Sequence, residues 1–273
     1  MTNPPQASRD LADLLAIMRY LRGPDGCPWD KIQTFATIAP YTVEEAYEVA
    51  SAIDENDLKA LPGELGDLLF QVVFHACIAE EAALFDLGDV IEAVSRKMIA
   101  RHPHVFGDEV SQSDAAAQKE YWESLKASER AGRGHTSLLD DVASALPALM
   151  RAEKLQKRAS TIGFDWNNTA SVVDKIAEEA REIVDAGADQ SQREEEVGDL
   201  LFAVANLARH LKVDPEAALR AANMKFTRRF RHIETALAAR GIAPGSASLK
   251  EMEALWDEAK RLENHCPPID NPY

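Results

Sequence analysis

Two acidic motifs in the second half of the chain contain carboxylates three or four residues apart, the spacing that places side chains on one face of a helix. EEARE occupies residues 178–182, and EEVGDLLF follows at residues 195–202. Residues three or four apart lie on one face of a helix, and two helices joined by a tight loop pack antiparallel. The carboxylates that would then converge are Glu179, Glu182, Glu196 and Asp199. Such an all-oxygen group suits Mg²⁺, with Mn²⁺ as an alternative, better than zinc, so the sequence predicts a divalent metal site.

The first half of the chain contains a similar pair of acidic motifs. EEAYE at residues 44–48 precedes GELGDLLF at residues 63–70. The acids that form a second candidate metal site are Glu45, Glu48, Glu64 and Asp67. Glutamate-rich helices are often only solvated faces, but here the acids adjoin apolar stripes and recur as pairs in both halves.

Further features recur in the same order in both halves. GCPW corresponds to GFDW, KMIAR corresponds to KFTRR, and Trp122 corresponds to Trp256. Repetition of a whole series predicts two tandem copies of one unit. We expect a first repeat at residues 1–130, a glycine-rich linker at 131–146, and a second repeat at 147–273 that holds the main active site.

The apolar residues that must position these acids recur at helical steps. One apolar stripe contains Leu11, Leu14, Leu15, Met18 and Leu21. Comparable apolar stripes begin at each GDLLF motif. Alternation of the kind that marks strands is missing between turn signals, so the predicted fold is all-α. The glycine of each Gly-Asp pair is expected to let a facing helix approach closely.

Basic and aromatic residues near these helices suggest a phosphate-bearing ligand. Lys225 and Arg229 are one helical turn apart, and Lys175 lies one turn before Glu179. Lysine and arginine neutralise phosphate oxygens that a metal leaves exposed. Trp166 and Trp256 are candidates for stacking on a base, with core packing as the alternative.

The composition narrows the classes of function. The chain has 273 residues, a net charge of -16 and 46% hydrophobic residues, so a packed core is expected. The acidic balance argues against binding to nucleic acid or to an anionic membrane surface. Three cysteines without metal-ligand spacing, a polar N-terminus and the lack of a long uncharged apolar run predict a cytoplasmic protein. There is no GxxxxGK[ST] loop and no GxSxG motif, and neither acidic helix contains Glu-x-x-His.

These residues resemble the MazG family of nucleoside triphosphate pyrophosphohydrolases. The resemblance rests on the acidic motifs and on two further segments, CPWDKIQTFATIAPYTVEEAYE and RHPHVF. It covers nearly the whole chain. It implies a helical bundle of the all-α NTP pyrophosphatase superfamily and a homodimer. It also implies Mg²⁺-dependent hydrolysis of NTPs, including ATP, and dNTPs to the monophosphate and pyrophosphate.

The resemblance assigns roles to individual positions. The implied metal ligands are Glu179, Glu182, Glu196 and Asp199, and the implied nucleotide contacts are Lys175, Glu178, Glu179, Gln192, Glu195, Asp199, Lys225, Arg229 and Trp256. At residues 191–193 the sequence is SQR, and a lysine contact that the family pattern suggests is not matched there. We further expect Glu178, a carboxylate not committed to metal, to accept the proton of the attacking water.

The second repeat has the fuller set of charged groups. It has Lys175 where the first has Tyr41, and Glu195 where the first has Gly63. The second repeat is therefore the expected catalytic site, and the first is expected to be weakly active or to serve packing and dimerisation. Two alternatives remain: a scaffold or sensor that binds Mg-nucleotide without cleaving it, and an enzyme of narrow specificity that resembles dimeric dUTPases.

Overall fold

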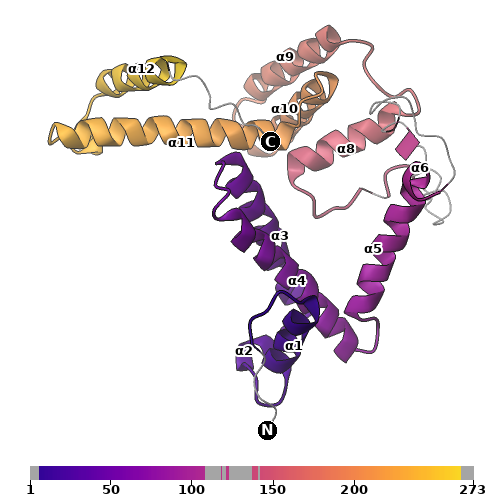
Figure 1. Ribbon diagram of the computed structural model, residues 1–273. Coiled ribbons are helices and arrows are strands. Elements are labelled where there is room, and N and C mark those ends of the chain that lie inside the picture. Colours follow the sequence, from indigo (N-terminus) through magenta and orange to yellow (C-terminus); the bar gives the residue numbers. More distant parts are fainter. Residues whose placement is uncertain (1–5, 108–117, 119–120, 123–136, 141, 266–273) are drawn as a thin grey trace. The chain divides into compact units, whose positions relative to one another are not determined.

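The computed structural model describes residues 6–107, 118, 121–122, 137–140 and 142–265 (Figure 1). Within these residues the regular structure is helical and no strand is present, which confirms the predicted all-α class. The chain divides into two compact units, residues 1–126 and 127–273. Of the predicted linker, residues 131–146, the structure describes residues 137–140 and 142–146, and the limits of the linker stay a prediction.

The first unit is built around a hairpin of two long helices, α3 and α4, with α1 packed on α4. Its helices are α1 (Leu11–Arg22), α2 (Pro28–Lys31), α3 (Phe35–Asp54), α4 (Leu61–Glu81), α5 (Leu87–Arg101) and α6 (Pro103–Phe106). Helix α3 begins with a capping box, in which the Thr34 side chain and the Thr37 side chain each accept a backbone N–H of the other residue.

The core of the first unit lies between α1, α3 and α4. Met18, Ile38, Val73 and Phe74 are almost completely buried there. Burial of side chains of this size contributes about 1.5–3 kcal/mol each relative to exposure. Two arginines of α1 reach α4 at its C-terminal end, where Arg19 pairs with Glu80 and Arg22 pairs with Glu81, each at 2.6 Å.

Helix α4 is long and apolar enough to cross a membrane by length and composition alone. It carries Glu64 and Asp67 near its start and buries Val73 and Phe74 against other helices. A core helix of a water-soluble protein passes the same test, so this single helix is weak support for a membrane span.

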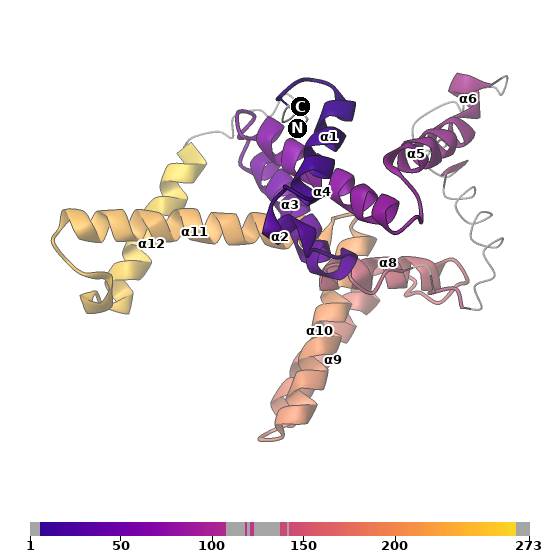
Figure 2. The same ribbon diagram turned by 90° about the horizontal axis from the view of Figure 1, so that it is seen from below.

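The second unit repeats the hairpin as α9 and α10, which lie side by side in both views (Figures 1 and 2). Its helices are α8 (Ala148–Ser160), α9 (Thr169–Asp185), α10 (Gln190–His210), α11 (Pro215–Ala239) and α12 (Leu249–His265), with a short 3-10 turn, η1 (Pro244–Ser246). Gly187 in the α9–α10 loop has a φ of +58°, a conformation that favours glycine and ends the helix sharply. Helix α8 packs on α10, where the Gln156 amide donates to the Phe202 carbonyl at 2.8 Å.

Helices α11 and α12 form a second packed pair in this unit. Ile233, Leu237 and Leu255 are buried between them, and Trp256 packs at the edge of this cluster. The pair therefore has an apolar core of its own, separate from the residues that join α8, α9 and α10.

The expected role of the Gly-Asp glycines is wrong. A Cβ built on Gly66 or Gly198 would meet no atom within 4 Å, because both residues lie on exposed faces of α4 and α10. Close approach of a neighbouring helix of this chain is therefore not the reason for glycine at either position.

Candidate active site

The α9–α10 hairpin brings together three of the predicted metal ligands. Carboxylate oxygens of Glu179, Glu182 and Glu196 all lie within 4.8 Å of one another. Asn168 caps the start of α9 by accepting the N–H of Ser171 at 2.9 Å. The short loop after α9 then turns the chain back, so that i, i+3 neighbours on one helix face an acid on the other.

Asp199, the fourth predicted ligand, is not part of this group. It lies on α10 one turn beyond Glu196, and its side chain is exposed. The hairpin thus places three predicted ligands together and leaves the fourth within one helical turn of them.

Lys175 lies against the acidic group on the α9 side. Its Nζ is 2.7 Å from Oε1 of Glu179 and 2.8 Å from Oε1 of Glu178. Glu179 is only 4% exposed, and a buried carboxylate needs a cation or hydrogen-bond donors as partners. Lys175 supplies that partner from one helical turn away.

The protonation of the group follows from these contacts. The hydrogen bond from Lys175 lowers the pKa of Glu179, and hydrogen bonds with Glu182 and Glu196 lower it further, against the opposing effect of burial. The hydrogen bond with Glu179, together with burial and repulsion from the neighbouring acids, raises the pKa of Glu182. One carboxylate is therefore held ionised beside one that protonates more readily, as expected when acids crowd together.

The first hairpin contains a matching acidic group without the lysine. Carboxylate oxygens of Glu45, Glu48 and Glu64 lie within 4.8 Å of one another. Burial first, and then the hydrogen bond and repulsion from Glu48, raise the pKa of Glu45, with Asp67 adding to the effect. In the position of Lys175 stands Tyr41, whose ring meets that of Trp29 edge-on at 6.0 Å.

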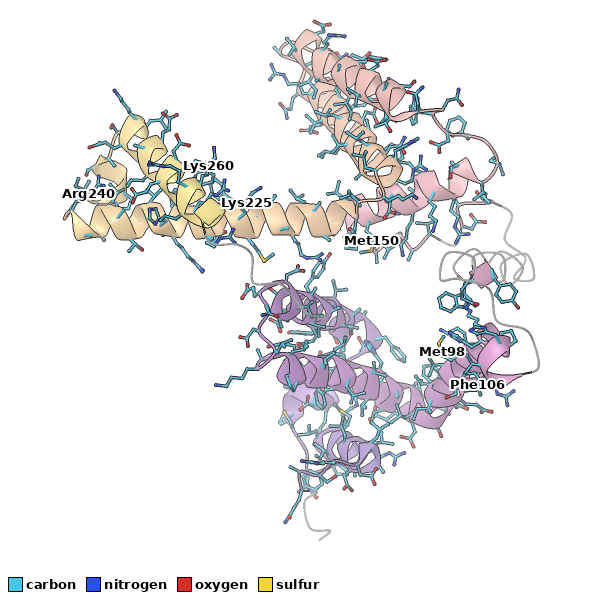
Figure 3. The ribbon with its side chains drawn as sticks, turned by 45° about the horizontal axis from the view of Figure 1, so that its top comes forward. Met98, Phe106, Met150, Lys225, Arg240 and Lys260 are labelled. Carbon is cyan, nitrogen blue, oxygen red and sulfur yellow. The ribbon has the colours of Figure 1, made fainter. Side chains whose placement is uncertain are left out.

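The predicted phosphate and base contacts gather where α11 and α12 pack together. The guanidinium of Arg229 lies 5.3 Å from the centre of the Trp256 ring and is paired with Glu263 at 2.8 Å. Figure 3 labels Lys225 on α11 beside α12, and this lysine is exposed. In the first repeat, the Trp122 indole likewise meets the residue that corresponds to Arg229, donating to the Arg101 carbonyl at 2.8 Å.

The remaining predicted contacts lie on α9 and at the start of α10. Glu178 is exposed and bound to Lys175. Gln192 is exposed, and its backbone N–H is used in capping α10, where it donates to Asp189 at 3.1 Å. Glu195 is also exposed, one residue before Glu196.

In the α11–α12 cluster, Glu263 was not predicted, and Phe226 was not assigned a role of its own. Glu263 pairs with both Arg228 and Arg229, and the Phe226 ring lies 5.4 Å from that of Trp256. Their spacing offered a usable signal, because Glu263 follows Trp256 by seven residues and so shares its face of α12. Phe226 directly follows Lys225 and is 58% exposed.

The acidic group of α9 and α10 fits a divalent cation. Its donors are all carboxylate oxygens, the ligands that Mg²⁺, Mn²⁺ and Ca²⁺ prefer. Oxygens on one such ion sit about 2.0–2.6 Å from it, so a spread of 4.8 Å is close to what a shared ion requires.

Comparison with known proteins identifies the family of this chain. The MazG nucleotide pyrophosphohydrolase domain model matches twice, at residues 33–106 and 167–234. A nucleoside triphosphate pyrophosphohydrolase of Escherichia coli K12 is 52% identical over 255 residues, covering 92% of this chain and 97% of the relative. A Thermotoga maritima protein named nucleoside triphosphate pyrophosphohydrolase/pyrophosphatase MazG is 43% identical over 248 residues, covering 91% and 94%. A nucleoside triphosphate pyrophosphohydrolase of Mycobacterium tuberculosis is 40% identical over 162 residues, covering 58% of this chain and 47% of the relative. The chain belongs to the MazG family and contains two copies of its domain.

Proposed function

We propose that this protein is a Mg²⁺-dependent hydrolase that converts nucleoside and deoxynucleoside triphosphates to the monophosphate and pyrophosphate. The observation that carries the proposal is the convergence of Glu179, Glu182 and Glu196 beside Lys175 in the second hairpin. Relatives named nucleoside triphosphate pyrophosphohydrolase that align over most of the chain support the same activity. The net charge of -16 argues against nucleic acid or an anionic membrane as a partner, and we propose a cytoplasmic enzyme.

In this proposal, the second hairpin holds the metal. Glu179, Glu182 and Glu196 are the ligands that already lie together, and Asp199 joins them from the next turn of α10. A bound divalent cation would neutralise triphosphate oxygens and favour ionisation of the attacking water. Mn²⁺ satisfies the same oxygen ligands and is the natural probe for this site.

Glu178 is the proposed proton acceptor. It lies on α9 beside Glu179, but its carboxylate is outside the group of three and is exposed to water. A general base has to reach a water molecule without being fully occupied by a metal. Glu178 meets that condition, and its ion pair with Lys175 places it on the side where a phosphate would be neutralised.

Lys225, Arg229 and Trp256 are the proposed contacts to the rest of the nucleotide. Lys225 is exposed and would meet phosphate oxygens, while Arg229 would exchange Glu263 for a phosphate. The Trp256 ring, with Phe226 at 5.4 Å, offers an aromatic surface for a base.

We propose a homodimer as the active assembly. The two hairpins expose the same apolar stripe: Leu65, Leu69 and Val72 are 49%, 44% and 38% exposed on α4, and Val197, Leu201 and Val204 are 43%, 51% and 42% exposed on α10. Exposed apolar stripes of this kind are usually covered by a binding partner. A two-fold axis pairs the same surface of two copies of a chain, so it would cover such a stripe on both copies. A second copy of the chain is therefore the proposed occupant.

The dimer is tested by measuring the mass in solution. Light scattering on the purified protein should give about twice 30.1 kDa. Leu201→Glu should shift the protein towards the monomer, whereas Val184→Glu, at an apolar residue 76% exposed and outside the stripe, should leave the mass unchanged. A wild-type protein that is monomeric at micromolar concentration would contradict this part of the proposal.

The activity is tested by resolving the products of each common NTP and dNTP incubated with Mg²⁺. We expect the monophosphate and pyrophosphate, and we expect Glu182→Ala to abolish both. Binding of nucleotide without products would support the scaffold or sensor alternative, and turnover of one deoxynucleotide alone would indicate a narrow enzyme. Release of inorganic phosphate with the diphosphate as the other product would overturn the proposed reaction.

A further inference from the structure

We propose that Lys175 is a built-in competitor for the metal: a divalent cation displaces it from Glu179, and the displaced ammonium then binds the triphosphate. This inference rests on the proposed function, because it concerns the same acidic group. It adds that metal entry and substrate binding exchange partners through one lysine, rather than occurring at independent groups.

The first step of the argument is the competition for one carboxylate. Nζ of Lys175 is 2.7 Å from Oε1 of Glu179, which is one of the three acids that converge. A divalent cation on the same carboxylate would be held a few ångströms from the ammonium, where two positive charges repel strongly. Both cations therefore cannot make their best contacts with Glu179 at once.

The second step is that Lys175 has freedom to leave. It sits at i−4 from Glu179 and i−3 from Glu178, on a flexible side chain that is 34% exposed. Glu179, in contrast, is 4% exposed and has to keep a cation or a donor as its partner. A metal replaces the lysine at Glu179 without leaving that carboxylate unpaired.

The third step is what the exchange releases. Lys175 bridges Glu179 and Glu178, so its departure frees an ammonium and a carboxylate on the same side of α9. A triphosphate offers the ammonium new oxygens, and the freed Glu178 carboxylate is the proposed proton acceptor. Binding of metal and of triphosphate should therefore each favour the other, as linkage requires of sites that share one exchanging group.

The first hairpin provides an internal comparison. Tyr41 stands in the position of Lys175, and within the described residues no lysine or arginine is paired with Glu45, Glu48 or Glu64. A cation entering that group displaces no ammonium. The two hairpins should therefore differ in metal affinity in the direction opposite to their expected catalytic importance.

The test measures Mn²⁺ binding by electron paramagnetic resonance in a full-length parent that carries E45Q and E48Q, which disable the first group. In this parent, Lys175→Met should bind Mn²⁺ about threefold more tightly, the size expected when an ion pair whose lysine side chain is 34% exposed no longer has to be broken. Arg181→Met is the matched control, since it removes a positive charge from α9 at a residue next to Glu182 and makes no pair with Glu179. It should change the affinity much less than Lys175→Met.

The same titration with a non-hydrolysable α,β-imido triphosphate provides the decisive contrast. With the analogue bound, Lys175→Met should bind Mn²⁺ more weakly than the parent, so the order of the two proteins reverses. Simple removal of a charge would favour Mn²⁺ in both conditions and would overturn the exchange. Equal Mn²⁺ affinities of the Lys175→Met and Arg181→Met proteins without nucleotide would also overturn it.

The reverse substitution guards against a folding defect in Lys175→Met. In a parent with E179Q and E182Q, Tyr41→Lys should weaken Mn²⁺ binding at the first group about threefold. An unchanged affinity would overturn the competitor role. If the parent with the first group disabled binds no Mn²⁺ and the wild-type protein forms no products, the proposed function itself fails, which separates that failure from failure of the exchange alone.

Discussion

The two hairpins of this chain share their acids and differ in what neutralises them. In α3–α4 three carboxylates crowd together, and burial and mutual repulsion raise the pKa of Glu45. In α9–α10 the same three positions converge, but Lys175 pairs with Glu179 and lowers the pKa of that carboxyl. Convergence of acids alone therefore does not tell which of the two copies is the proposed catalytic one. The cation beside the acids is the difference on which the assignment depends.

The largest expected effect separates the proposed catalytic copy, α9–α10, from the other hairpin. Glu179→Gln should reduce the rate of pyrophosphate release by at least about 100-fold, because loss of a ligand exceeds the effect usually seen for residues that only orient ligands. Glu45→Gln, at the corresponding position of the first hairpin, should retain most of the activity. Steady-state assays of both variants check this, and equal losses would erase the functional distinction between the hairpins.

A second contrast concerns the basic residues that follow each hairpin. Lys225→Met should raise KM by at least about tenfold, since a hydrogen bond between an ammonium and a phosphate is worth about 1.5–3 kcal/mol. Lys97→Met, at the corresponding position of α5, should leave KM unchanged. Measuring KM and kcat for the two variants decides the matter, and a larger effect at Lys97 would place the nucleotide on the first repeat.

A third comparison concerns the glycines of the two Gly-Asp pairs, whose substitution should change stability in the same direction in both repeats. Gly66→Ala and Gly198→Ala should each stabilise the protein by about 0.5–1 kcal/mol, because alanine is the better helix former and its Cβ meets nothing within 4 Å. Denaturant unfolding measures both. Stabilisation at Gly66 with destabilisation at Gly198 would indicate a close neighbour of α10 in the assembled protein.

The smallest expected effect follows from exchanging the residue that distinguishes the hairpins. In EDTA, Lys175→Met should speed amide exchange in α9–α10 about twofold, and Tyr41→Lys should slow it in α3–α4 by a similar factor. Hydrogen exchange resolves the two hairpins within one chain. A change of the same sign in both would contradict the counter-ion role.

The stability that the Lys175–Glu179 ion pair contributes should depend on pH in a defined direction. The pKa of Glu179 is lowered, so its contribution to stability is present above the usual value of 4.5 and is lost as the pH falls through the lowered value. The pKa of Lys175 is raised, so the pair remains complete up to at least 10.5 and weakens only at higher pH. The difference in the free energy of unfolding between wild type and Lys175→Met should therefore be present at neutral pH and should fade in acid.

The sequence was sufficient for the fold class and for the convergence of acids, because both follow from periodicity. Apolar residues at three- and four-residue steps predicted the helices, and two acidic pairs joined by a short loop predicted that Glu179, Glu182 and Glu196 would meet. What periodicity does not contain is which of several neighbours a flexible side chain selects. Lys175 was predicted as a phosphate contact, and its pairing with Glu179 depends on the low exposure of that carboxylate.

Other details depend on solvent exposure and on separate elements. The Gly-Asp glycines were expected at a close helix contact, yet they face open space, because the sequence does not say which side of a helix is covered. Glu263 was overlooked because its partner Arg229 is 34 residues away on another helix.

Anomalous diffraction from crystals grown with Mn²⁺ and an α,β-imido triphosphate tests the central claim most directly. We expect a Mn²⁺ peak bounded by Glu179, Glu182 and Glu196, with the ammonium of Lys175 on a phosphate oxygen. A peak confined to Glu45, Glu48 and Glu64, with the second group unoccupied and Lys175 still on Glu179, would contradict the account.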